Sequence, residues 1–252
     1  MQEHKRRQLA IIHKYGVTNL HRQNPYIVAW WSAAFPGFGH YMLNQYFRAT
    51  LFTLTEVIIN TLAHVNEAIV YTYCGKFELA KSVLEPRWAL GYIIIYLYTI
   101  WNSYHSTLVQ NKLVHLGELE DERLDTMVFT TSGIQYLELK SPVIAAIYSF
   151  FFPGLGIVYN HRFLLGFYGI LWWLIYLTLS GAHESLAMLI TGNVEESIAI
   201  LNPHWLLFMP SVMWGATYHG VITAKQQNRL FRLEQRQFLR ERYGASDVRI
   251  FD

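Results

Sequence analysis

The sequence predicts an all-α integral membrane protein made of two tandem homologous repeats. Each repeat is expected to hold a short helix broken by a Pro-Gly pair, followed by two transmembrane helices. The first supporting observation is composition: 52% of the 252 residues are hydrophobic, 16% are aromatic and only 15% are charged. A soluble domain has about a quarter of its residues charged. This shortage of charge predicts a lipid environment.

The second observation is that the apolar residues gather in long blocks. A helix needs about 20 predominantly apolar residues to cross the hydrocarbon core of a bilayer. Blocks that meet this length cover residues 49–73, 88–109, 167–190 and 205–224. Two shorter blocks, 25–42 and 142–159, are interrupted by Pro-Gly pairs. These six blocks define the expected membrane segments.

The third observation is an internal duplication. Residues 24–113 align with residues 141–230 without a gap at a constant offset of 117, which pairs Pro25 with Pro142 and Trp88 with Trp205. A repeat of this length is treated as a structural unit. The predicted organisation is a basic N-terminal arm (1–23), repeat one (24–113), an acidic connector (114–140), repeat two (141–230) and a basic amphipathic C-terminal tail (231–252).

The pattern Ser-x-x-Phe-Pro-Gly-x-Gly occurs once in each repeat. Proline removes a backbone donor and clashes with the preceding helical turn, and glycine admits conformations closed to other residues. The first helix of each repeat must therefore break, and its tip is expected to be buried with Phe35, Phe38 and Tyr41 around it. We also expect these elements to act as structural or partner contacts, through Pro36, Gly37, Gly39, Pro153, Gly154 and Gly156.

A polar joint follows the second helix of each repeat, with the sequences CGKFELAKSVLEP and TGNVEESIAILNP. Each starts with a glycine that can end a helix and closes with a proline that suits the first turn of the next one. The joints predict a helix, a short interfacial helix and another helix.

Two topologies are compatible with the broken segments. If they cross the membrane, each repeat has three spans and the repeats are inverted. If they dip in and return, each repeat has two spans, and the connector and both termini share one face. Lys and Arg are enriched in cytoplasmic segments, and both terminal regions are basic. Both termini are therefore expected in the cytoplasm, and the re-entrant topology is favoured.

The sequence Phe-Pro-Gly-x-Gly, followed by an aromatic residue, a polar turn with Arg and an apolar helix, resembles the bacterial two-transmembrane-helix domain family, here in two copies. The closer match begins at Phe152 and reads FPGLGIVYNHRFLLGFYGILWW. The first copy departs from it with Ala49 in place of Gly166. The resemblance implies a bacterial inner-membrane protein, and some family members look like accessories to transport systems.

Intramembrane polar residues form the first candidate site. Ionisable residues inside a span usually face a bundle interior or a water path. In a continuous helix, Glu56, Asn60, His64 and Glu67 share one stripe, whereas the equivalent stripe of repeat two keeps only Glu184. The functional interpretation is a proton, cation or polar-ligand path; the structural one is mutual satisfaction of buried polar groups. A central transporter site usually draws on both repeats, so the asymmetry weighs against transport.

The C-terminal tail forms the second candidate site. Arg229, Arg232, Arg236 and Arg240 lie on one face of an expected helix. Basic residues near a membrane surface contribute about 1 kcal/mol each to binding of anionic headgroups. The tail is expected to lie on lipid or to dock a cytoplasmic partner.

Several chemistries are not expected. Cys74 is the only cysteine, the histidines lack close metal-ligand spacing, and no phosphate loop or nucleophile motif is found. The net charge of +2 gives no reason to expect nucleic acid as a partner. No metal, no cofactor and no enzymatic activity are predicted.

The preferred hypothesis is a non-catalytic accessory or scaffolding subunit of a membrane transport complex, such as an ABC-type transporter, in the bacterial inner membrane. Its expected partners are membrane lipid and a transporter permease. The alternatives are a small transporter or channel that uses the Glu56 stripe, and a membrane enzyme acting on lipid.

Overall fold

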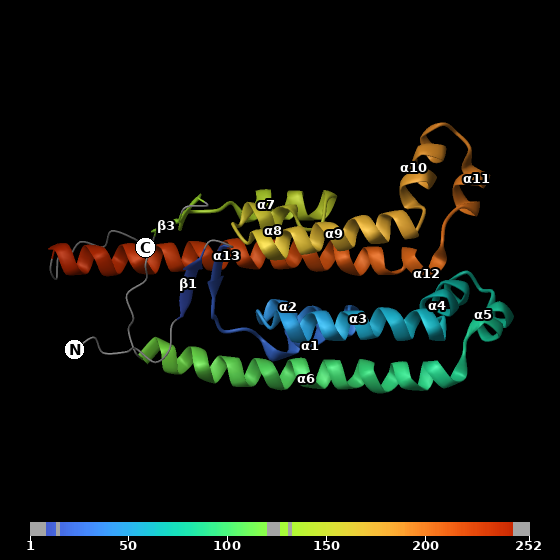
Figure 1. The fold of residues 1–252 in the computed structure, drawn as a ribbon, viewed down its shortest axis with the longest axis horizontal. Coiled ribbons are helices and arrows are strands. Elements are labelled where there is room, and N and C mark those ends of the chain that lie inside the picture. The colour runs from blue at the N-terminus through green and yellow to red at the C-terminus, as the bar shows by residue number, and fades with distance from the viewer. Residues whose placement is uncertain (1–8, 14–15, 120–126, 131–132, 244–252) are drawn as a thin grey trace.

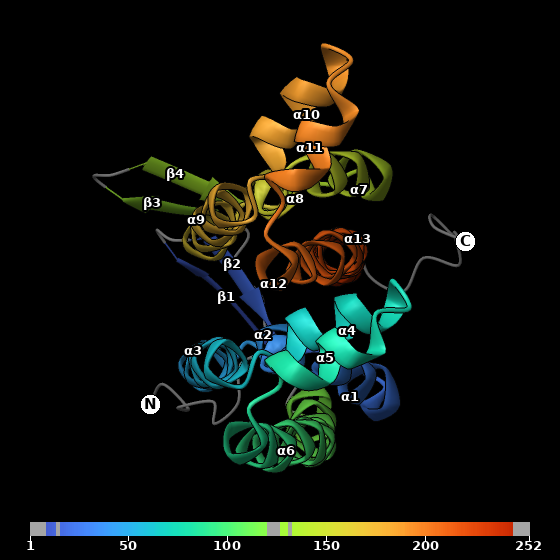
Figure 2. The same cartoon turned by 90° about the vertical axis from the view of Figure 1, so that its right-hand side faces the viewer.

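The computed structural model describes residues 9–13, 16–119, 127–130 and 133–243. It is mostly helical, as expected, and its long helices run side by side along the longest axis of the molecule (Figure 1). Seen end-on, the helices of the first half form one group and those of the second half form another (Figure 2). The two halves therefore meet along the length of the bundle.

The helices of the two halves follow a corresponding order, except that the second half has one additional short helix, α12, before its last long helix. The first half contains α1 (Pro25–Ala34), α2 (Phe38–Met42), α3 (Tyr46–Ala63), α4 (Val65–Tyr73), α5 (Phe77–Val83) and α6 (Pro86–Leu119). The second half contains α7 (Pro142–Phe151), α8 (Leu155–Tyr159), α9 (Phe163–Leu179), α10 (Ala182–Ile190), α11 (Val194–Ala199), α12 (Pro203–Leu206) and α13 (Phe208–Tyr243). Helices α5 and α11 lie where the short joint helices were expected.

Two antiparallel hairpins lie in the regions that the sequence marked only as arm and connector. They pair β1 (Ala10–His13) with β2 (Gly16–Asn19), and β3 (Met127–Thr130) with β4 (Gly133–Tyr136). The first hairpin is anchored to the second half, because the N–H of Val17 donates to the carbonyl oxygen of His161 at 3.2 Å. A Cβ at Gly16 would lie 2.0 Å from the same oxygen, so this close contact requires glycine.

Each broken segment forms a helical hairpin. Helices α1 and α7 start with a proline in the first turn, which needs no hydrogen bond there. They end before the Pro-Gly pairs, where Gly37 and Gly154 have φ angles of 94° and 103°. Helices α2 and α8 then lead the chain back, so that the side-chain nitrogen Nε2 of Gln23 donates to the carbonyl of Met42 at 2.6 Å. The two helices of each pair therefore lie side by side, α1 against α2 and α7 against α8.

Glycine allows the two arms of each hairpin to touch. A Cβ at Gly39 would lie 2.3 Å from the Oγ of Ser32, and a Cβ at Gly156 would lie 2.1 Å from the Oγ of Ser149 and 2.2 Å from the carbonyl oxygen of Ala145. All three distances are far below contact distance. The second glycine of each motif is therefore required for helix packing inside the hairpin.

An asparagine near the end of each long helix holds the start of the hairpin of its own half. In the first half, Asn111 accepts from the N–H of Gln23 at 2.9 Å and donates to its carbonyl at 2.8 Å. In the second half, Asn228 accepts from the N–H of Lys140 at 2.7 Å and donates to its carbonyl at 2.8 Å. We call these contacts the asparagine clamps.

Three of the expected long helices are broken, which corrects the prediction; the block 205–224 is divided at Leu207, between α12 and α13. The block 49–73 is divided into α3 and α4 at His64, whose φ angle of 55° is left-handed, and the block 167–190 is divided into α9 and α10 at Gly181, with φ of 70°. Among the described residues, no single helix combines the length and apolar character needed to cross a membrane. Helices α9 and α10, bent by 62°, meet those requirements only together.

The main apolar core lies between the halves. Phe35 and Val57 of the first half pack with Trp173, Tyr176 and Phe208 of the second half. Phe35 makes edge contacts with the rings of Tyr176 and Phe208, at centroid separations of 6.5 and 6.1 Å. Aromatic pairs of this kind stabilise the contact beyond simple burial. The tip of the first helical hairpin, formed by α1 and α2, is thereby fixed against α9 and α13.

Candidate functional site

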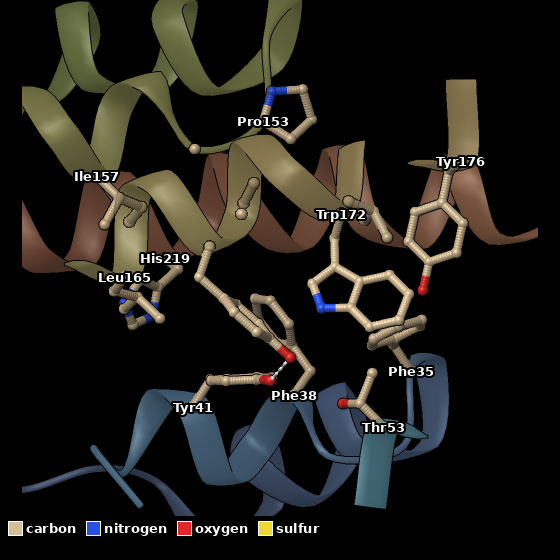
Figure 3. Close-up of a pocket in the computed structure, with 15 residues that line it drawn as sticks. Phe35, Phe38, Tyr41, Thr53, Pro153, Ile157, Leu165, Trp172, Tyr176 and His219 are labelled. Atoms are coloured by element: carbon tan, nitrogen blue, oxygen red, sulfur yellow. Dashed lines mark hydrogen bonds between the residues drawn. The ribbon is translucent and has the colours of Figure 1, made fainter. Parts of the chain in front are cut away.

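A cavity of about 90 Å³ lies beside this core, between the two halves (Figure 3). Residues from the helical hairpin of α1 and α2 and from α3 line one side, and residues from α8, α9 and α13 line the other. Aromatic side chains dominate the lining, among them Phe35, Phe38, Tyr41, Trp172 and Tyr176. We call this space the aromatic cavity. Its lining suits an apolar ligand better than a polar one.

A hydrogen bond between two tyrosines crosses the boundary between the halves. The hydroxyl of Tyr41 donates to that of Tyr168 at 2.6 Å, drawn as a dashed line in Figure 3. Both tyrosines, together with Leu165, also line a second pocket of about 450 Å³. The aromatic cavity and the second pocket therefore adjoin each other.

Arg162 is a buried cation in the wall of the second pocket. The residue precedes α9 and is only 5% exposed. Its Nη2 donates to the Oδ1 of Asn44 and to the hydroxyl of Tyr46, and its Nη1 lies 3.4 Å from the Nε2 of His219. Within the described part of the chain, no carboxylate lies within 4.0 Å of this guanidinium. Its hydrogen-bond partners are neutral polar groups.

The sequence did not single out Arg162 as a site residue. The position that corresponds to it in repeat one is Gln45, so comparing the repeats gives no signal there. A lone Arg in a polar turn is typical of a membrane surface. Its burial becomes visible only when Asn44 and Tyr46 of the other half are placed beside it.

The structure keeps only part of the predicted polar stripe together. Glu56 is buried, and its Oε1 accepts from the Nδ2 of Asn60 at 2.9 Å. The same nitrogen lies 2.9 Å from the Oδ1 of Asn66, whose own amide donates to the carbonyl of His204 at 3.1 Å. The sequence missed Asn66. This network of buried polar groups connects α3 and α4 to α12 of the second half.

The other members of the stripe lie elsewhere, which corrects the prediction of one continuous face. The break at His64 turns α4 away, and the Nδ1 of His64 pairs at 3.1 Å with Glu67 near the surface. Glu184 is exposed and lies beside His183, at 3.6 Å. The prediction assumed an unbroken helix, but His64 is left-handed and ends α3. No path of ionisable groups links these residues within the described chain.

The proline and the two glycines of each Pro-Gly-x-Gly motif are buried. The expectation that the hairpin tip is buried among Phe35, Phe38 and Tyr41 is confirmed. The residues expected to act as structural or partner contacts lie against the chain's own helices, and their role in partner contacts stays a prediction: Pro36, Gly37, Gly39, Pro153, Gly154 and Gly156. Gly39 and Gly156 are buried because the two helices of each hairpin lie too close together to leave room for a Cβ.

The basic residues of the tail are exposed along α13. This helix continues without a break through Arg229, Arg232, Arg236 and Arg240, all of which are exposed. Three of them line a groove of about 710 Å³ next to Pro142. Binding of anionic headgroups or of a partner at these arginines stays a prediction. Among the described residues, no cluster of His, Cys, Asp or Glu has the arrangement of a metal site.

Comparisons with protein-family models, with curated proteins and with solved structures gave no match to this chain. The resemblance to the two-transmembrane-helix domain family therefore stays a prediction.

Proposed function

We propose that this chain is a non-catalytic integral membrane protein, built from two tandem copies of a broken-helix unit, that serves as an accessory or scaffolding subunit of a membrane transport complex. The observation that carries the membrane assignment is an inverted distribution of polarity. Fully buried polar side chains line the contacts between helices, at 0% exposure, including Ser32, Asn60, Thr99, Ser103 and Thr107. Large apolar side chains cover the outside.

Helix α6 illustrates this distribution most clearly. Thr99, Ser103 and Thr107 are buried in the first half of the bundle, where α6 packs against α1 and α3. The other face carries Ile94, 64% exposed, and Leu97, 59% exposed. Small and hydroxyl residues at helix contacts are typical of membrane bundles. In water, this arrangement would leave an unusually large apolar face in contact with solvent.

The hairpins support the re-entrant topology within this proposal. Helix α1 has 10 residues, so at a rise of 1.5 Å per residue it is about 15 Å long, half of a hydrocarbon core of about 30 Å. The start of β1, the start of β3 and the end of α13 lie at one end of the bundle, and the joint helices α5 and α11 lie at the other (Figure 1). The basic tail supports assigning the first end to the cytoplasm.

The polar network around Glu56 supports the accessory role over transport. Asn60 and Asn66 bind neighbouring groups and bridge the halves, which is a structural task. The transporter or channel remains the alternative, because the second oxygen of Glu56 is buried without a hydrogen-bond partner among the described groups. An enzyme acting on lipid is the second alternative.

Membrane insertion and orientation can be tested with the single native cysteine. Cys74 is exposed and follows α4, at the end opposite the tail. An impermeant maleimide should label Cys74 in intact spheroplasts. The matched control is Arg240→Cys in a Cys74→Ser background, which should be labelled only after permeabilisation. Release of the protein from membranes by alkaline carbonate would refute membrane insertion, and the reverse labelling pattern would refute the orientation.

The accessory role needs a separate experiment. The protein is purified from native membranes in a gentle detergent, and co-eluting chains are identified by mass spectrometry. A permease or ATPase in fixed ratio is expected, and Glu56→Gln should keep the association. A homogeneous homo-oligomer with no other chain would overturn the accessory role. Loss of a transport activity in Glu56→Gln would support the transporter instead.

A further inference from the structure

The buried charge of Arg162 is not balanced by a carboxylate in the described chain. Burying a cation removes its hydration, and this loss is normally offset by an anion. The partners of Arg162 are the amide oxygen of Asn44, the hydroxyl of Tyr46 and the ring of His219. A guanidinium has five N–H donors, and these contacts with described residues involve only its two terminal nitrogens. The site therefore has the capacity to bind an anion.

The pocket beside Arg162 has a lining that suits such an anion. Among its described lining residues there is no Asp or Glu, and Thr18, Tyr46 and Thr50 contribute hydroxyl groups. Glu138 binds Lys140 and lies 3.5 Å from the Nε2 of His161, the residue before Arg162. It is not in the lining. The volume of about 450 Å³ is within the range of small-molecule sites, about 300–1,000 Å³.

The charged pocket and the aromatic cavity are arranged in series. Leu165, Tyr168 and Tyr41 belong to both. A molecule that places an anionic group on Arg162 can therefore place apolar atoms next to Phe38 and Trp172 on the other side of these three residues. One end requires negative charge, and the other requires apolar surface. This combination of requirements describes an amphiphile.

We infer that the space between the two halves binds an anionic lipid, with its phosphate or carboxylate headgroup on Arg162 and the adjoining part of an acyl chain in the aromatic cavity. The inference rests on the proposed membrane location, which supplies the ligand. The tail groove at Arg229 and Arg232 is a separate surface, because it is exposed and lined by several cations. The site between the halves would instead recognise the negative headgroup and the acyl chain of one lipid molecule at the same time.

The test uses the full chain purified in a neutral detergent and reconstituted into nanodiscs that contain phosphatidylcholine, with or without phosphatidylglycerol or a fatty acid. Lipid retained after transfer back to detergent is quantified by mass spectrometry. Arg162→Gln removes the charge, Arg162→Lys is the matched charge control, and Ala216→Phe adds bulk to the aromatic cavity, which Ala216 lines. Binding of inorganic phosphate alone is measured by calorimetry.

The wild-type protein should retain the anionic lipid in preference to phosphatidylcholine. Arg162→Gln should reduce this preference about tenfold or more, which corresponds to losing a hydrogen bond to a charged group, while Arg162→Lys should keep most of it. Ala216→Phe should lower retention of lipid without creating phosphate binding. Phosphate binding equal to lipid binding would show a headgroup site only and would overturn the role of the cavity.

Equal retention by the wild-type protein and Arg162→Gln would overturn the inference, provided that both variants show the same helical circular dichroism. Carbonate extraction of the same membranes separates this failure from that of the proposed function. A protein that stays in the membrane but shows no lipid preference contradicts only the lipid site. A protein that carbonate releases contradicts the membrane location on which the site depends.

Discussion

Substitution of Gly156 by alanine tests the close packing of the second helical hairpin, α7 and α8, most directly. The added Cβ would lie 2.1 Å from the Oγ of Ser149 and 2.2 Å from the carbonyl oxygen of Ala145. The serine hydroxyl can rotate away, but the carbonyl belongs to the backbone of α7. Helices α7 and α8 must therefore separate. Overpacking of this kind costs about 1–3 kcal/mol.

That cost corresponds to a fall of about 2–12 °C in the melting temperature of a chain of this size. The assay is thermal unfolding of the detergent-purified protein, followed by tryptophan fluorescence and by circular dichroism. Gly91→Ala is the matched control, because a Cβ at Gly91, inside α6, meets no atom within 4 Å. Gly39→Ala should behave like Gly156→Ala, since its Cβ would lie 2.6 Å from the carbonyl oxygen of Val28. If Gly156→Ala melts at the same temperature as Gly91→Ala, the close packing of the hairpin is refuted.

Two further predictions concern the end of the bundle that carries the C-terminal tail. Asn228→Leu should lower stability by about 2 kcal/mol, because it leaves the N–H and carbonyl of Lys140 without their partners; Gln226→Leu on the same helix is the control, and equal melting temperatures would contradict the clamp. Burial lowers the pKa of His21 from 6.5 to about 4, so the unfolded chain takes up a proton before the folded chain does, and stability should fall as the pH drops from about 6.5 to about 4. His21→Gln should reduce this loss in melting curves recorded across that range, and an identical pH dependence in both proteins would show that His21 does not contribute.

The sequence predicts the breaks that depend on backbone chemistry. Pro36 and Gly37 restrict the backbone in any surroundings, and the structure breaks the first helix there. Gly75 and Pro86 likewise bound the first joint, and α5 lies between them. These positions were predictable because the residue itself, rather than its neighbours, determines the local conformation.

Breaks imposed by tertiary contacts were not predictable. His64 is not a typical helix-ending residue, yet it adopts φ of 55°, because α4 must turn for Asn66 to reach both Asn60 and the carbonyl of His204. The predicted stripe lost His64 and Glu67 for this reason. A pattern of spacing along one helix contains no information about a partner 138 residues away.

The candidate site at Arg162 was not predictable from the sequence for the same reason. Burial of Arg162 depends on Asn44 and Tyr46, which come from the other half of the chain. The repeat alignment pairs Arg162 with Gln45, and therefore hides the residue instead of revealing it. Contacts between the halves are asymmetric even where the backbone paths correspond. The repeat alignment therefore predicts the helical scaffold but not the candidate site at Arg162.

Polar bridges connect the two halves on both sides of the aromatic cavity. Arg162 binds Asn44 and Tyr46 toward the end that carries the tail, and Asn66 binds the carbonyl of His204 toward the end that carries the joint helices. These bridges, together with the packing of Phe35, set the separation of the halves during folding. The cavity is therefore preorganised: its opening is part of the folding free energy, and a molecule that enters it does not have to force the helices apart.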